Sequence, residues 1–306
     1  MSASAYQWIA DSLPVGKAGQ PLLDIGFYVT FFFEDGHLVE RRRAVYEIMK
    51  EYWFRVGEHL RWTTNLETHK WEPVTAKHSA NAWLAFQPNE PRVWDVNLHA
   101  GETFDAASPY RFVGLGTPDA ESAMSFISAM FPVTWFVEHP EASAVDIVLR
   151  WATLLQPRHG TAGLSIVASL DEASASETQD EARGLAERFP GFEVDDALFE
   201  SADVQNGIRS VNWLTCIDDS LIARLGGIEA LRARVTGDLH LYEYSGGAIV
   251  RAGDFPQAGD RNRQITIEPY RHAAALLRPV QIEATHNGIM LGFDKESTQD
   301  WVNRFN

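Results

Sequence analysis

A glycine-rich stretch late in the chain, GGAIVRAGDFPQAGDRNRQ at residues 246–264, holds residue types that acid–base chemistry or anion binding requires. Asp254 and Asp260 could act as carboxylates beside a histidine such as His272, which would make the protein a hydrolase. Such an enzyme needs a pocket that brings Asp260, Arg261 and a histidine together and shifts the pKa of a carboxylate. The stretch therefore raises a catalytic hypothesis.

The same stretch also fits a structural role, which the sequence favours. Gly246 and Gly247 lie in a predicted hairpin turn and would supply positive φ angles. Gly253 and Gly259 bracket a corner at Pro256. The neighbouring aspartates have side chains short enough to bond nearby backbone N–H groups. Because no nucleophile, metal cluster or phosphate-loop lysine accompanies these residues, we interpret the stretch as a surface connection.

Metal and cofactor sites are not indicated elsewhere, and we expect no cofactor and no metal. None of the ten histidines falls in HExxH, HxH or HxxxH spacing, and no cysteine pair exists. The chain also lacks a GxSxG elbow and a GxxxxGK[ST] phosphate loop. The acid pairs at 34–35, 195–196 and 218–219 stand where a turn or a helix cap requires a short acceptor, so a capping role is favoured over acid–base work.

Two further features have simpler explanations than chemistry. Gly114-Leu115-Gly116 resembles the start of a dinucleotide loop, but the third glycine is missing, so we expect a strand-to-helix turn. Cys216 is the single cysteine and lies in the apolar run VNWLTCI. It is expected to be a buried, inert thiol, and a lone cysteine fits a reducing compartment.

The distribution of charge is more informative. Residues 171–203 contain eleven acidic residues and only Arg183 and Arg188 as bases, which is more than half of the net charge of −16. Such a concentration can steer a cationic partner, although an ordinary solvated helix and loop would look the same. On charge alone, the candidate contact residues are Asp171, Glu172, Glu177, Asp180, Glu181, Glu193, Asp195 and Asp196.

The charge of the whole chain restricts its partners. A net charge of −16 repels phosphate backbones and anionic lipids, so we expect no nucleic acid and no membrane as partner, and a basic protein fits better. The first residues, MSASAYQWIADSLPVGKAGQ, lack the pattern of a secretory signal, and the apolar runs are too short to span a bilayer. The expected location is the cytoplasm.

The elements of the first half follow from hydrophobic periodicity. LLDIGFYVTFFF at 22–33 predicts a core strand that stops at a turn around Gly36, and the apolar spacing from Val45 to Leu60 predicts a long amphipathic helix. We expect short strands at 82–87, 93–100 and 110–116. A helix capped by Thr117 should carry Met124, Ile127 and Phe131 on its apolar face and end at Pro132, and another should begin at Pro140.

The second half repeats this alternation. Strands are predicted at 163–169 and 211–217, and Ser174 with Glu177 should form a capping box for a helix that runs to Phe189. Asp218 or Asp219 should cap a short helix that breaks at 226–227 and resumes to residue 234. A hairpin around Gly246, a helix near 268–277, a strand over PVQIEA at 279–284 and a frayed end complete the chain.

These elements predict an α/β (α+β) protein with a mixed, largely antiparallel β-sheet, or two abutting sheets, covered by amphipathic helices. We expect an N-terminal extension at 1–20, a single domain at 21–285 and a C-terminal segment at 286–306. Strand–helix alternation on both sides of residue 140 suggests two similar lobes, 21–140 and 141–285.

Several stretches together resemble a known family. They are FYVTFFFEDGHLVERRRAVYEIMKEYW (27–53), RWATLLQPRHGTAGLS (150–165), FPGFEVDD (189–196), IRSVNWLTCIDDSLIARLGG (208–227), GGAIVRAGDFPQAGDRNR (246–263) and YRHAAALLRPVQ (270–281). In this series of tryptophan, glycine and proline positions the chain is similar to the bacterial type VI immunity family, formerly a domain of unknown function. The resemblance spans roughly residues 25–281.

The resemblance implies an immunity protein rather than an enzyme. Such a protein, an antitoxin of interbacterial competition, binds and neutralises a cognate toxin effector that a type VI secretion system delivers. The cytoplasmic location implies a toxin that acts there, such as a nuclease, and the acidic stretch fits the basic surface that a nuclease needs. No functional residue is carried over from the family, because its shared motifs stand where the fold requires them. The hydrolase around Asp254, Asp260 and His272 stays as the alternative, and a generic acidic scaffold with many partners is a third interpretation.

Overall fold

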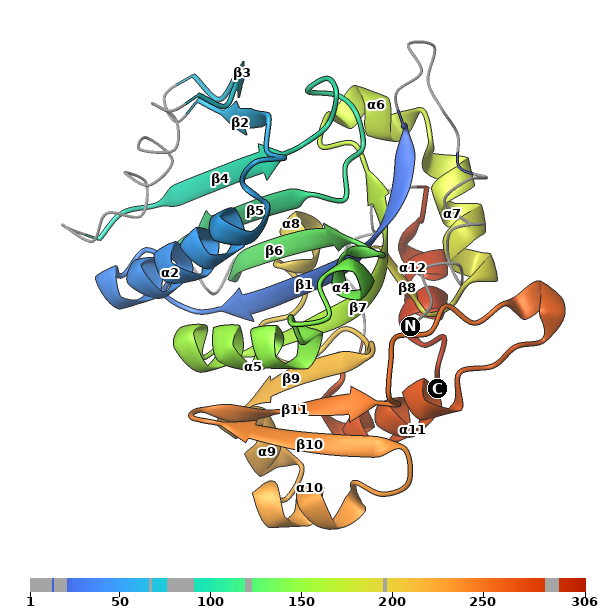
Figure 1. Ribbon diagram of the computed structural model, residues 1–306. Helices are drawn as coiled ribbons and strands as arrows, with labels where there is room; N and C mark the ends of the chain where they lie inside the picture. The colour runs from blue at the N-terminus through green and yellow to red at the C-terminus, as the bar shows by residue number, and fades with distance from the viewer. Residues whose placement is uncertain are drawn as a thin grey trace.

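The computed structural model describes residue 13 and residues 21–65, 68–75, 91–118, 123–194, 197–283 and 292–306. Eleven strands in these residues form one sheet in the order β10-β11-β9-β7-β1-β6-β5-β4-β2-β3, with β8 paired to β7 (Figure 1). Their bounds are β1 Leu23–Phe33, β2 Trp62–Thr64, β3 Trp71–Pro73, β4 Trp94–His99, β5 Arg111–Gly116, β6 Ser125–Pro132, β7 His159–Ala168, β8 Phe192–Val194, β9 Leu214–Asp218, β10 Leu239–Tyr244 and β11 Gly247–Ala252. The β7–β8 pair is parallel and the other pairings are antiparallel, so the predicted mixed, largely antiparallel sheet is confirmed as one sheet.

Helices cover this sheet, as the α/β class predicts. Their bounds are α2 Val39–Val56, α4 Trp135–Glu138, α5 Ala144–Leu155, α6 Glu172–Ser176, α7 Gln179–Arg188, α8 Ala197–Glu200, α9 Asp219–Arg224, α10 Ile228–Arg234, α11 Glu268–Leu277 and α12 Lys295–Val302, with 3-10 turns η1 Arg261–Arg263 and η2 Arg278–Val280. No helix of the described residues is long and apolar enough to cross a membrane.

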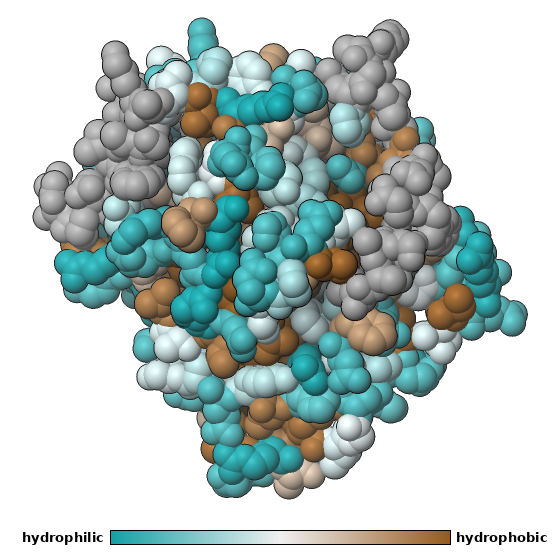
Figure 2. All heavy atoms as spheres, viewed as in Figure 1, coloured by the Kyte–Doolittle hydropathy of each residue, from teal (hydrophilic) through white to brown (hydrophobic). Residues whose placement is uncertain are grey.

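The long central strand β1 sorts the core into two faces, because successive side chains of a strand point to opposite sides. Phe27 and Phe31 belong to the main core with Tyr52 of α2 and Trp151 of α5. Figure 1 shows α2 and α5 side by side in front of the sheet, and Figure 2 shows hydrophilic side chains mixed with apolar ones on this side of the molecule. This face of the sheet is therefore closed by amphipathic helices.

The opposite face carries a smaller cover. Phe32 of β1 packs there with Val113 and Phe126 of the neighbouring strands and with Ala197 of the short helix α8. A third cluster joins α7 and α12 to the β7–β8 region through apolar side chains such as Phe192 and Trp301. The four-residue helix α8 thus sits on a broad strand surface.

Many predicted elements are confirmed. β1, the turn that follows it, α2, β4, β5, α11 and the β10–β11 hairpin lie where periodicity places them. Asp218 caps α9 by accepting a hydrogen bond from the Leu221 N–H at 2.8 Å, and the helix breaks at Gly226 before α10. The helix expected from Pro140 begins at Ala144 instead, after a Ser143 cap. The strand expected at 82–87 lies outside the described residues.

The helix predicted between Thr117 and Pro132 is wrong, because Ser125–Pro132 is β6. β6 lies between β1 and β5, and its side chains are buried on both faces from Ser125 to Phe131. A strand buried on both faces shows no alternation of polar and apolar residues, so a short apolar run can match helical spacing equally well. Pairing with two distant strands decided the outcome.

The turn predicted at Gly114-Leu115-Gly116 is also wrong, since these residues end β5. Gly114 and Gly116 leave space for the side chain of Trp94. The indole Nε1–H of Trp94 donates to the Gly36 carbonyl at 2.8 Å. A Cβ on Gly116 would lie 2.0 Å from the Nε1 atom of Trp94. The glycine is therefore required by a close side chain and not by a loop.

Three further predictions for the second half need correction. Asp171, not Ser174, caps the first helix of the acidic segment, which then breaks into α6 and α7. The strand expected over PVQIEA is replaced by η2 and a single bridge from Gln281 to Ile208. The expected frayed end contains α12, whose start at Asp294 has a capping box. In each case a local side-chain cap or a distant contact outweighs the periodic pattern.

Candidate partner-binding surface

The acidic segment forms an exposed patch over α6 and α7. Glu172 on α6, Glu177 at the C-cap of α6, and Asp180 and Glu181 on α7 are exposed. We call these four residues the acidic patch. Asp171 is half-buried, and its carboxylate accepts from the Ser174 N–H at 3.0 Å as the cap of α6. Asp195 and Asp196 lie outside the described residues.

The two basic residues of this segment form ion pairs with carboxylates outside the acidic patch. Arg183 Nε lies 2.8 Å from the Glu187 carboxylate, and Arg188 reaches the Asp260 carboxylate at 3.0 Å. Within the described part of the chain, no cationic side chain lies within 4.0 Å of an acidic-patch carboxylate. Among the described residues the patch carboxylates therefore form no ion pair, and Arg183 interacts with Asp180 only through the longer-range field, so the excess of negative charge favours a cationic partner.

Glu193 has a different role from the one the sequence indicated. It is 3% exposed and binds Arg209 at 2.6 Å and Arg304 at 3.3 Å. Arg209 also binds Glu200 at 2.5 Å. These four residues form a buried ion cluster that ties β8, α8 and the end of α12 together. Glu193 therefore belongs to the interior of the fold.

The groups of the hydrolase hypothesis have separate partners. Asp254 lies 3.3 Å from Arg251, and its side chain is 80% exposed. Asp260 is buried against Arg188, whose guanidinium holds the pKa of that carboxyl below its usual range. The Nδ1 atom of His272 lies 3.0 Å from the Asp238 carboxylate. The His272 side chain lines two surface pockets, and neither Asp254 nor Asp260 lines them. The structure does not bring these three groups together.

The glycine-rich stretch has the structural features expected of a connection. Gly246, Gly253 and Gly259 have φ angles of 101°, 80° and 65°, and the Asp260 side chain accepts from the Asn262 N–H at 3.0 Å. Gly247 differs from the prediction because its φ is not positive. A Cβ at Gly247 would lie 2.3 Å from the Ile217 carbonyl, so close strand approach explains this glycine.

Other titratable groups of the interior are held neutral. Burial lowers the pKa of His159 to about 3 and that of His99 to about 4. Cys216 is buried, and burial raises the pKa of its thiol, as expected for an inert cysteine. The described residues contain no group of three or more His, Cys, Asp or Glu side chains that could hold a metal ion.

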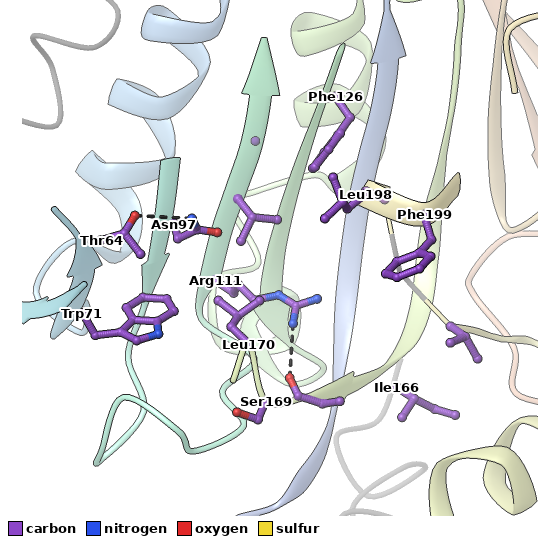
Figure 3. A pocket seen from close by; sticks show the side chains of 15 residues that line it. Thr64, Trp71, Asn97, Arg111, Phe126, Ile166, Ser169, Leu170, Leu198 and Phe199 are labelled. Atoms are coloured by element: carbon purple, nitrogen blue, oxygen red, sulfur yellow. Dashed lines mark hydrogen bonds between the residues drawn. The ribbon is translucent and has the colours of Figure 1, made fainter. Parts of the chain in front are cut away.

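Sequence reasoning missed an apolar groove on the sheet face that carries α8. It has a volume of about 370 Å³ and lies between α8, the β2–β3 hairpin, strands β4 to β8 and the two residues that follow β7. Figure 3 shows Trp71 on one side, Leu198 and Phe199 of α8 on the other, and Arg111 between them. Leu198 and Phe199 are 57% and 42% exposed. The sequence shows that Leu198 and Phe199 are adjacent apolar residues, but their exposure is visible only in the structure.

Comparison with known proteins adds three findings. The family model described as "TsiV: Type VI immunity for VRR-NUC" matches residues 44–305. The solved structure of the Pseudomonas aeruginosa type VI secretion system protein PA0821 is similar, with a TM-score of 0.81 and 19% identity over 99% of this chain and 90% of that chain. This likeness shows a shared fold. No curated protein matches the sequence. The family match contains the recognised motifs from residue 150 onward.

Proposed function

Because the chain belongs to the TsiV family of type VI immunity proteins, we propose that it binds and neutralises a nuclease toxin of the VRR-NUC type delivered by a type VI secretion system. The match over residues 44–305 is the observation that carries this proposal, since the printed description of the family names both the immunity role and the nuclease. Binding of a cognate toxin requires a surface and no chemistry, so we propose a protein without catalytic activity.

The acidic patch supports a nuclease as the partner. A nuclease must hold a phosphate backbone and therefore carries basic surface. Negative charge on α6 and α7 is complementary to such a surface and would accelerate encounter. We infer that the patch lies in the interface. Because a nuclease acts where DNA is, we propose that this binding takes place in the cytoplasm.

The hydrolase alternative has no comparable support. Asp254, Asp260 and His272 engage Arg251, Arg188 and Asp238. An enzyme that degraded the toxin would protect at less than one copy per toxin, whereas an immunity protein protects stoichiometrically.

Charge reversal tests the proposal in bacteria that express the toxin. The triple change Glu172→Lys, Glu177→Lys and Glu181→Lys should weaken the affinity for the toxin at least about tenfold and reduce protection of growth, because each lysine would repel the basic partner. Growth is measured against toxin dose, with wild-type chain as reference.

A matched control reverses three glutamates on other elements. Glu58, Glu141 and Glu229 have side chains that are 83%, 71% and 79% exposed, so Glu58→Lys, Glu141→Lys and Glu229→Lys change the net charge equally. Protection should persist in this control. Failure of the wild-type chain to protect against any VRR-NUC toxin would refute the function, and equal protection by both variants would move the interface away from the acidic patch.

A further inference from the structure

The groove beside α8 has the composition of a binding site for an apolar side chain. Its floor includes Val113 and Phe126, which are 9% and 5% exposed, and its rim includes Trp71, Leu198 and Phe199. Leu198 and Phe199 are adjacent on one short helix and only about half buried, so the pair forgoes part of the stabilisation that full burial would give. The volume of about 370 Å³ falls in the range of roughly 300–1,000 Å³ that ligand sites occupy.

The rest of the lining fits an apolar occupant. Arg111 is the only charged residue among the described residues that line the groove, and its Nη1–H donates to the Ala168 carbonyl at 3.2 Å (Figure 3). The other lining side chains are apolar or uncharged. The occupant should therefore present an apolar body.

The lining of the groove comes within two residues of the acidic patch along the chain. Ser169 and Leu170 line it, and the next residue, Asp171, caps α6 and donates its backbone N–H to Ser169 Oγ at 2.9 Å. Glu172 of the acidic patch follows at once. An apolar centre with a charged rim is the usual anatomy of a protein interface. The negative charge of the neighbouring acidic patch favours a basic partner surface around the apolar side chain that enters the groove.

We propose that this groove is the anchor site for the toxin, and that it receives an apolar or aromatic side chain that projects from a basic surface of the partner. The inference rests on the proposed function and adds a location and a chemistry to it. The acidic patch sets the rate and the salt dependence of encounter, and the groove holds the complex once it has formed.

Truncation of the rim tests the anchor. The double variant Leu198→Ala and Phe199→Ala should bind a catalytically inactive VRR-NUC toxin about 30-fold or more weakly, with a less negative heat-capacity change of binding and an unchanged salt dependence. Isothermal titration at several temperatures and salt concentrations gives all three quantities. Phe199→Gln changes a single exposed side chain without altering the net charge and should weaken binding in the same way.

Two exposed apolar residues outside the groove provide the control. Phe54 and Leu154 are 90% and 45% exposed, and Phe54→Ala with Leu154→Ala should leave affinity unchanged. If the wild-type chain binds the toxin and the groove variants bind equally well, the anchor site is wrong while the function stands. Absence of wild-type binding would instead overturn the function. A wild-type dimer that the groove variants convert to a monomer would assign the groove to a second copy and overturn the proposal.

Discussion

Asp24, His99 and His159 link stability to pH at the residue scale. The two histidines are buried in their neutral form, with pKa values lowered to about 4 and 3. An unfolded histidine binds a proton below about pH 6.5, so the unfolded state gains protons there and stability falls as the pH drops. Asp24 acts in the opposite direction, because burial raises its pKa to about 6.

The change Asp24→Asn should therefore stabilise the protein at neutral pH. Above about pH 6 the folded protein must hold an ionised, half-buried carboxylate, whereas the unfolded carboxylate ionises from about pH 4. In the wild-type protein, Asp24 lowers the free energy of unfolding as the pH rises from about 4 to 6. The asparagine variant should not lose this stability, so its free energy of unfolding at pH 7.5 should be higher by about 1–2 kcal/mol after allowance for solvent contact. The hydrogen bond from the Ile25 N–H, at 2.7 Å, can be kept by the amide oxygen.

Urea unfolding of both proteins between about pH 4 and pH 8 measures this effect. Asp300→Asn on α12 changes an exposed aspartate and should alter stability by less than about 0.5 kcal/mol. A gain for Asp24→Asn that did not shrink toward acid pH would show that the carboxylate is not the cause.

Residue-level predictions succeeded where the cause is local. The cap of Asp218 and the turn glycine Gly246 depend on their immediate neighbours. Glu193 could not be placed, because its partners Arg209 and Arg304 are 16 and 111 residues away. A charge count treats a buried carboxylate and an exposed one alike, so the sequence assigned Glu193 to the surface.

The same limit appears at the scale of elements. The amphipathic helix α2 and the hairpin β10–β11 were predictable, since their patterns are complete within one segment. Strand β6 was read as a helix, because burial by β1 and β5 on either side removes the alternation that marks a strand. Helix α12 was missed because its docking depends on a buried ion cluster and on stacking of Arg304 over Trp301.

Arg304→Met tests how α12 is held. The change leaves Glu193 with one cation fewer in a buried site, and removal of one partner from a buried ion pair costs about 3–5 kcal/mol. We expect a loss of about 2–4 kcal/mol, since Arg209 still contacts Glu193. Chemical denaturation gives the free energy of unfolding.

Lys295→Met is the matched control, because it removes a cation from the exposed start of the same helix. Its effect should stay within about 0.5 kcal/mol. Equal unfolding midpoints for the two variants would contradict the role assigned to the ion cluster.

At the scale of the whole molecule, the two faces of the one sheet are covered to different extents by helices. Helices α2 and α5 cover one face, and the short helix α8 leaves a groove on the other, near the acidic patch. The sheet order and the groove could not be derived from the sequence, since both depend on strands far apart along the chain. The class of fold, the family and the four acidic residues of the patch could be derived from the sequence.

Binding of the nuclease toxin is the central claim, and isothermal titration of the wild-type chain with a catalytically inactive VRR-NUC toxin tests it most directly. We predict one-to-one binding with a Kd of about 10 nM or tighter, as in other specific inhibitory complexes. Affinity should fall between about 50 mM and about 300 mM salt, because the acidic patch faces a basic surface. Absence of a complex at micromolar concentrations would contradict the function, and tight binding that did not respond to salt would contradict the electrostatic interface.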